Sequence, residues 1–123
     1  MAIILIVEDE PFLAEMYRDK FIKSGFEILL TNSAEEGLKV AKEYKPDLIL
    51  LDILLPNENG TSLLAWMREE MSIAHVPVLV FSNYDDEEMR NKALDLGAKD
   101  YLIKTNHTPG EIISRIKDLL NEK

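Results

Sequence analysis

The chain has 123 residues, no cysteine and a formal net charge of −9, with 46% hydrophobic and 30% charged residues. This length and composition predict one globular domain over residues 1–123, with a core that needs no disulfide and with no effector domain. The acidic charge argues against nucleic acid and membrane surfaces as partners. The lack of cysteine, and an N-terminal apolar run (2–7) without a basic leader, fit a cytoplasmic location.

The chain opens with a strand followed by a helix. Residues 3–7 form a continuous apolar run, which is typical of a strand buried on both faces. Pro11 suits the first turn of a helix, and Gly25 ends that helix. The inner face of the helix is predicted to comprise Phe12, Leu13, Met16, Tyr17, Lys20 and Phe21.

The next two units lead to an apolar strand with a carboxylate at its end. A second strand is expected over residues 26–30, and residues 33–36 form the capping box of a second helix. The third strand, 48–51, ends at Asp52, and Pro, Asn and Gly residues in 56–60 force a turn. Asp52 is therefore a candidate nucleophile or metal ligand, with capping of local backbone N–H groups as the alternative.

The second half of the chain continues the alternation. Thr61 or Ser62 is expected to cap the third helix, and the fourth strand covers 76–81 and ends at Ser82. The acidic run 85–88 suits the positive end of the fourth helix dipole.

The fifth unit completes the predicted fold. Strand 100–103 ends at Lys104, and residues 108–111 form a capping box for the last helix. Five strand–helix units in a row predict an α/β fold with a parallel sheet and helices on both faces. We expect the flavodoxin-like strand order 2-1-3-4-5.

Parallel strands place their carboxyl ends at one edge of the sheet, so the residues that follow them should meet. These residues are Glu8, Asp9, Asp52, Ser82 and Lys104. Three carboxylates without His or Cys favour a hard cation such as Mg²⁺. Lys104 suits a phosphoryl or carboxylate oxygen, and Ser82 supplies a hydroxyl, although either side chain could instead be solvated or cap a turn. Together these are the groups that aspartyl phosphorylation requires.

Four stretches of the chain resemble a known family. They are residues 7–10, 50–60, 80–82 and 96–104. With these residues, in this order and at these intervals, the chain resembles the receiver domain of two-component response regulators over nearly its whole length. The resemblance is to the stand-alone, single-domain type, like the chemotaxis regulators.

The resemblance implies that Asp52 is the phosphoacceptor, served by a histidine kinase or a phosphotransfer protein. It implies that Glu8, Asp9 and Asp52 bind Mg²⁺ together with the backbone carbonyl of Leu54. The protein would control an unknown downstream protein. It would catalyse its own phosphorylation and dephosphorylation without turning over an external substrate.

The resemblance also implies a switch. Ser82 and Lys104 would contact the phosphoryl group, and Tyr101 would move inward on activation. Ser82 and Tyr101 would thereby alter the face made by the fourth helix, the fifth strand and the fifth helix.

Three residues depart from the family pattern. Glu8 stands where Asp is commoner, and Asn83 stands where a small residue is usual and could crowd the phosphoryl pocket. In the family, a proline follows the lysine and the peptide bond between the two is cis. In this chain Thr105 stands in place of that proline. Because a cis bond before a non-proline residue costs about 2.5–4 kcal/mol, we predict a trans bond there. The loop to Thr108 should still let Lys104 reach Asp52.

Three other functions fit the same topology less well. A flavin-binding electron carrier would need a Ser/Thr/Gly-rich phosphate loop where residues 8–11 are acidic. A receiver that works without phosphorylation is disfavoured by the intact acidic residues and lysine. An aspartyl phosphatase would need a second Asp two residues after Asp52, where the sequence has Leu54.

Overall fold

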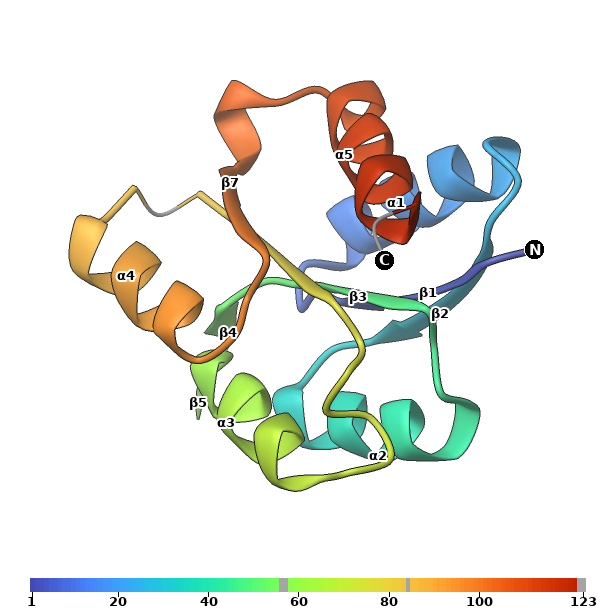
Figure 1. Ribbon diagram of the computed structural model, residues 1–123. Helices are drawn as coiled ribbons and strands as arrows, with labels where there is room; N and C mark the ends of the chain where they lie inside the picture. The colour runs from blue at the N-terminus through green and yellow to red at the C-terminus, as the bar shows by residue number, and fades with distance from the viewer. Residues whose placement is uncertain (56–57, 84, 122–123) are drawn as a thin grey trace.

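Five parallel strands form the central sheet of the computed structural model, which describes residues 1–55, 58–83 and 85–121 (Figure 1). The strands are β1 (Ile3–Val7), β2 (Glu27–Thr31), β3 (Leu48–Leu51), β6 (Val78–Ser82) and β7 (Asp100–Ile103). Their order is β2-β1-β3-β6-β7, and every neighbouring pair is parallel. Counted along the chain, this is the predicted order 2-1-3-4-5, so the flavodoxin-like fold is confirmed.

Among the described residues, five α-helices cover the sheet on both sides. They are α1 (Pro11–Lys23), α2 (Ala34–Tyr44), α3 (Thr61–Glu69), α4 (Glu87–Asp95) and α5 (Pro109–Asn121). α1 and α5 lie on one face, and α2, α3 and α4 lie on the other (Figure 1). In β1, Ile4 and Ile6 pack toward α1 and α5, whereas Leu5 and Val7 pack toward α2 and α3. Because helices cover both faces of the sheet, the side chains on both sides of a strand are buried and apolar. This explains the continuous apolar runs in the sequence.

Side-chain caps define where the helices begin. The Glu10 carboxylate accepts from the backbone N–H of Leu13 at 3.1 Å and so caps α1. Ser33 Oγ accepts from the N–H of Glu36 at 3.1 Å at the start of α2. At α5 the predicted box is reciprocal, with Glu111 N donating to Thr108 Oγ1 at 3.1 Å and Thr108 N donating to Glu111 Oε1 at 2.8 Å. Such caps contribute about 1 kcal/mol each.

The inner face of α1 is narrower than predicted. Its buried residues are Ala14, Tyr17 and Phe21, whereas Phe12 is 85% exposed and Lys20 is also exposed. At 3.6 residues per turn Phe12 lies about 180° from Phe21, so the two cannot face the same layer. Placing Phe12 and Lys20 on the inner face was therefore wrong.

Two predicted boundaries also need correction. Gly60 occupies the N-cap of α3, and Thr61 is already its buried first residue, so neither Thr61 nor Ser62 is the cap. β6 begins at Val78 rather than Val76, immediately after Pro77, which has no N–H to donate to a neighbouring strand.

A short antiparallel ladder that was not predicted follows the central strand. β4 (Leu54–Leu55) pairs with β5 (Glu58–Asn59). Pro56 and Asn57, which the sequence analysis assigns to a turn, lie outside the described residues.

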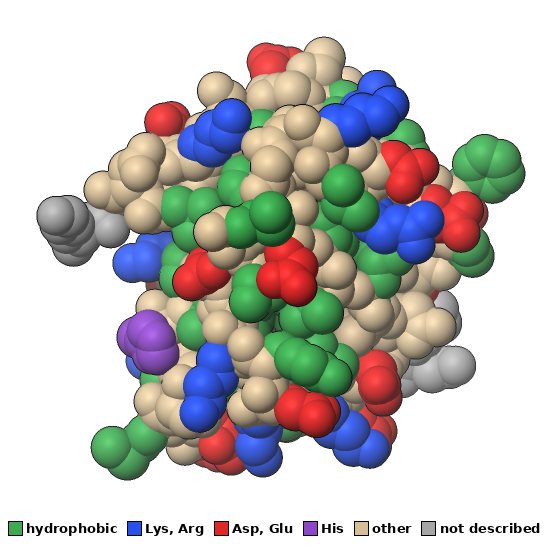
Figure 2. All heavy atoms as spheres, turned by 90° about the vertical axis from the view of Figure 1, so that its right-hand side faces the viewer, with side chains coloured by type: hydrophobic (Ala, Val, Ile, Leu, Met, Phe, Trp, Pro, Cys, Tyr) green, Lys and Arg blue, Asp and Glu red, His purple; other side chains and the backbone are tan. Residues whose placement is uncertain are grey.

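Charges of both signs are mixed on the surface. Figure 2 shows one face of the molecule, where Lys and Arg side chains lie scattered among Asp, Glu and apolar side chains. In the described ranges, none of the helices has the length and hydrophobicity needed to cross a bilayer.

Candidate functional site at the carboxyl edge of the sheet

The strand order brings the predicted site residues together. Glu8 and Asp9 follow β1, Asp52 follows β3, Ser82 ends β6, and Lys104 follows β7. Two backbone hydrogen bonds extend the ladder past the strand ends: Glu8 N donates to Thr31 O, and Asp52 N donates to Val7 O, each at 3.0 Å. The backbone under both carboxylates is therefore fixed by the sheet.

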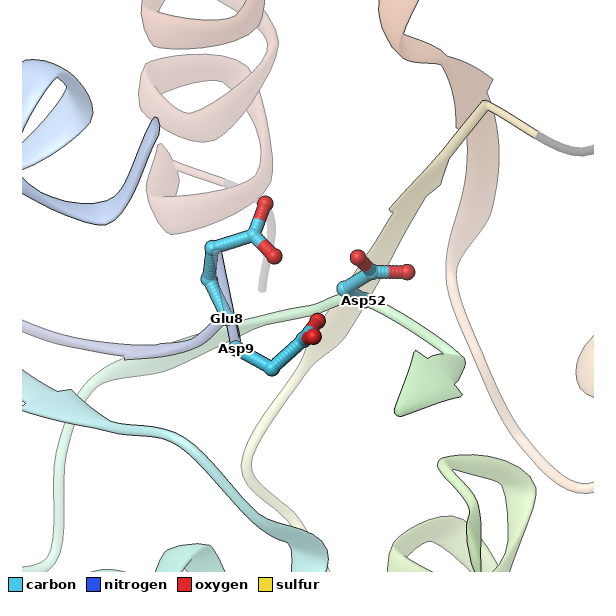
Figure 3. A group of neighbouring side chains, drawn as sticks. All are labelled: Glu8, Asp9 and Asp52. Atoms are coloured by element: carbon cyan, nitrogen blue, oxygen red, sulfur yellow. The ribbon is translucent and has the colours of Figure 1, made fainter. Parts of the chain in front are cut away.

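Three carboxyl groups converge at this edge (Figure 3). Glu8, Asp9 and Asp52 each place an oxygen within 4.8 Å of the other two. Glu8 is 2% exposed and Asp52 is 5% exposed, while Asp9 is half-buried. A cluster with only oxygen donors fits a hard divalent cation, because such ions prefer carboxylate ligands. These three residues form a possible metal-binding group.

A cavity of about 470 Å³ opens beside the carboxylates, between the ends of β1 and β2. Its lining includes Glu8, Asp9, Glu15 and Glu36, and no Lys or Arg belongs to the described lining. The cavity therefore offers a cation an acidic approach to the cluster.

Lys104 ties two of the carboxylates together. Its Nζ donates to Asp52 Oδ2 at 2.9 Å and also forms an ion pair with Glu8 Oε1. The Lys104 side chain is only 7% exposed. A buried ammonium with two carboxylate partners avoids the cost of an unpaired buried charge.

The environment shifts the pKa values of this pair. Burial raises the pKa of the Glu8 carboxyl from 4.5 to about 7, against the opposing effect of the Lys104 hydrogen bond. Burial would lower the pKa of Lys104, but hydrogen bonding to Glu8 and the charge of Asp52 outweigh it, so the pKa is raised. Lys104 is thus charged at neutral pH, and the Glu8 carboxyl of the metal-free protein holds its proton more tightly than an exposed carboxyl does.

Lys104 reaches the site through a trans peptide. Among the described residues no peptide bond is cis, so the Lys104–Thr105 bond is trans, as predicted. Lys104 begins a short 3₁₀ helix, η1 (Lys104–Asn106), and its side chain still contacts Asp52. Both parts of the prediction about Thr105 are confirmed.

Ser82 and Tyr101 form a second contact pair next to the carboxylates. Ser82 is fully buried and Tyr101 is 2% exposed; burial raises the pKa of the Tyr101 hydroxyl, and the Ser82 side chain opposes that rise. The Arg90 guanidinium lies 5.2 Å from the centre of the Tyr101 ring and pairs with Asp85 at 3.5 Å. Tyr101 therefore lies inward, in contact with the edge. Asn83 is exposed, and its effect on the phosphoryl pocket or on dephosphorylation stays a prediction.

The loop after Asp52 depends on a glycine. A Cβ on Gly60 would lie 2.6 Å from Ile53 Cα and 2.7 Å from Asp52 O, and Gly60 N donates to Ile53 O at 2.8 Å. Only glycine permits this close approach. Leu54 begins β4 in the same loop, and metal binding by its carbonyl stays a prediction.

Two aromatic residues next to Lys104, Phe81 and Tyr17, were not predicted to lie at the site. Lys104 Nζ lies 4.6 Å from the centre of the Phe81 ring, and Tyr17 packs edge-on against that ring, with centroids 5.2 Å apart. The position of Phe81 in the sequence could have predicted this contact, because Phe81 directly precedes Ser82 on the strand that the Lys104 side chain must cross.

Comparison with known proteins agrees with this site. Residues 4–117 match the family described as "Response regulator receiver domain". The chain is 32% identical over 123 residues to the polar-differentiation response regulator DivK of Brucella ovis, covering 97% of this chain and 96% of DivK. It is 33% identical over 117 residues to the regulatory protein PhoP of Bacillus subtilis, covering 95% of this chain and 48% of PhoP. The chain thus spans about half the length of PhoP.

Solved structures show the same architecture. A CheY-like receiver domain protein from Methanospirillum hungatei has a TM-score of 0.89 and 26% identity, covering 98% of this chain and 94% of that one. The BeF3-activated receiver domain of Klebsiella pneumoniae RstA has a TM-score of 0.88 and 27% identity, and the match covers 98% of this chain and 99% of that one. The chain therefore belongs to the receiver domains of two-component response regulators, and it is a phosphorylation-controlled signalling switch.

Proposed function

We propose that Asp52 is the phosphoacceptor and that it takes its phosphoryl group from a phosphohistidine of a histidine kinase or phosphotransfer protein. One observation supports this assignment most strongly. Asp52 is the carboxylate at the end of the central strand β3, and Lys104 bonds it at 2.9 Å within reach of two further carboxylates. A nucleophile beside a cation and a cation-binding cluster is what phosphoryl transfer requires.

The transfer forms one bond and breaks another. An oxygen of Asp52 attacks phosphorus, the P–N bond to the donor histidine breaks, and the imidazole leaves with the electron pair of that bond. The Lys104 ammonium and the Ser82 hydroxyl donate to the phosphoryl oxygens, where negative charge is spread in the transition state.

Magnesium is the cation that we assign to the carboxylate cluster. Glu8, Asp9 and Asp52 would hold it together with the Leu54 carbonyl, and it would supply positive charge to the phosphoryl oxygens. Two side chains of the cluster are already buried at fixed positions, so little ordering is needed on binding.

We assign the output to the surface made by α4, β7 and α5. Once Ser82 turns toward a phosphoryl group, its interaction with the Tyr101 side chain changes. Tyr101 lies on β7 and contacts Arg90 of α4, so the change is passed directly to this surface. A local charge change thereby selects between two packings.

The protein is proposed to act as a stand-alone cytoplasmic receiver that binds a downstream protein rather than nucleic acid. The match to 96% of DivK favours this organisation, since a single receiver makes up nearly all of that protein. The net charge of −9 disfavours phosphate contacts to nucleic acid.

Intact mass spectrometry tests the assignment of Asp52. With acetyl phosphate and Mg²⁺ the wild type should gain one phosphoryl mass, and Asp52→Asn should gain none. Asp118→Asn, at an exposed carboxylate on α5, is the matched control and should label like the wild type. Equal labelling of Asp52→Asn and wild type would refute the assignment.

A further inference from the structure

Lys104 has to cross a strand to reach its partners. It follows β7, Asp52 follows β3, and β6 lies between these strands in the sheet. Two strand spacings amount to about 10 Å, which leaves a lysine side chain little slack. Whatever lies at the end of β6 therefore lies under the path of the Lys104 side chain.

The residue at that place is Phe81. Its ring is fully buried, and Lys104 Nζ stands 4.6 Å from the ring centre. An ammonium within about 6 Å of an aromatic centroid is attracted to the negative face of the ring, and the attraction is stronger where both groups are desolvated. The contact therefore adds an attraction to those that the two carboxylates exert on Lys104.

The Phe81 ring is itself held from outside the site. Tyr17 of α1 packs against it with an interplanar angle of 70°, and the Tyr17 side chain is buried in the same core layer. The ring therefore has little freedom to turn away from the ammonium.

We propose that Phe81 is a positioning residue, whose ring face holds the Lys104 ammonium where it meets the phosphoryl oxygens on Asp52. The role goes beyond apolar packing, since a leucine would fill the core there without offering a negative face. It rests on the proposed function, because positioning matters only if Asp52 accepts the phosphoryl group. It also provides a local means of aiming Lys104 in a chain that has Thr105 after the lysine.

Graded fluorination of the ring separates electrostatics from packing. We would replace Phe81 by 4-fluoro-, 3,5-difluoro- and 3,4,5-trifluorophenylalanine, which weakens the negative ring face stepwise at nearly constant shape. The rate of phosphorylation by acetyl phosphate at saturating Mg²⁺ should fall along the series, by about tenfold at trifluorophenylalanine. Phe81→Leu should lose at least as much.

Phe21 provides the matched control. It is fully buried in the same layer and also packs against Tyr17, with centroids 5.9 Å apart. The same fluorinated series at Phe21 should leave the rate unchanged. A second measurement is a double-mutant cycle in the free energy of unfolding. Trifluorination of Phe81 should lower this free energy less in a Lys104→Met background than in the wild-type background.

The outcomes separate the two proposals. A wild type that gains no phosphoryl group would refute the proposed function itself. A wild type that is phosphorylated, but whose rate is unchanged by fluorination at Phe81 or falls equally at Phe21, overturns the role of Phe81 alone. A double-mutant cycle that shows no coupling energy between Phe81 and Lys104 also overturns the role of Phe81.

Discussion

Lys104 joins residues that are far apart in the sequence, since its two partners lie 52 and 96 positions away. The rule that parallel strands end at one edge was enough to predict that Glu8, Asp52 and Lys104 meet. It could not predict that Lys104 would pair with both carboxylates, or that Phe81 would lie beneath it. Those contacts depend on side-chain rotamers and on which face of β6 each residue occupies, and the sequence leaves both open.

The raised pKa of Glu8 predicts an unusual pH dependence of stability without metal. Between about pH 4.5 and pH 7 the folded protein holds a proton on Glu8 that the unfolded chain has released. The free energy of unfolding should therefore fall as the pH rises through this range, by on the order of 3 kcal/mol. Urea titrations in magnesium-free buffer at several pH values measure it.

Glu8→Gln is the comparison for this prediction. Its amide is always neutral and still offers an oxygen to Lys104, so the variant should lack the fall that the wild type shows. The difference between the two proteins cancels the titration of other groups. Parallel pH profiles for variant and wild type would contradict the assignment of the fall to Glu8.

Among the helices and strands, type and order were predicted more accurately than boundaries. All five parallel strands were predicted, β1 and β3 from continuous apolar runs, and the reciprocal box at Thr108 and Glu111 formed as expected. The misplaced α1 residue Phe12 and the missed β4–β5 ladder have different causes. Phe12 was assigned by hydrophobicity rather than by helical angle, whereas a two-residue ladder is too short to leave a periodic signal.

The glycine beside Asp52 gives a prediction for the loop. Gly60→Ala should destabilise the protein by about 1–3 kcal/mol and slow phosphorylation, because its Cβ would strike the backbone of Asp52 and Ile53. Gly110→Ala is the control, since its Cβ would meet only Thr108 Oγ1, at 3.8 Å. Urea denaturation and labelling rates measure both effects. Equal stability of the two variants would show that the loop absorbs the added methyl group.

At the scale of the whole molecule, the carboxylate cluster makes stability depend on metal. Magnesium at ten times its Kd should stabilise the native state by about 1.4 kcal/mol and raise Tm by a few degrees. Asp9→Asn should weaken this response. Because the substitution also relieves repulsion among Glu8, Asp9 and Asp52, the metal-free variant should melt above the metal-free wild type.

Thermal melts with and without magnesium test both statements, with Asp118→Asn as the control for losing one surface carboxylate. An unchanged or lower Tm for metal-free Asp9→Asn would mean that repulsion does not dominate at this cluster. An undiminished magnesium shift in the same variant would remove Asp9 from the ligand set.

The contact between Lys104 and Glu8 also has a consequence for synthesis. These residues lie 96 positions apart, at nearly opposite ends of the polypeptide. A nascent chain that has left the ribosome only as far as β6 already contains Asp52 and the carboxylates, but it has no lysine to complete the edge. If Lys104 assists phosphoryl transfer to Asp52 as proposed, a chain shortened before β7 should gain no phosphoryl mass from acetyl phosphate and Mg²⁺, because Lys104 follows β7.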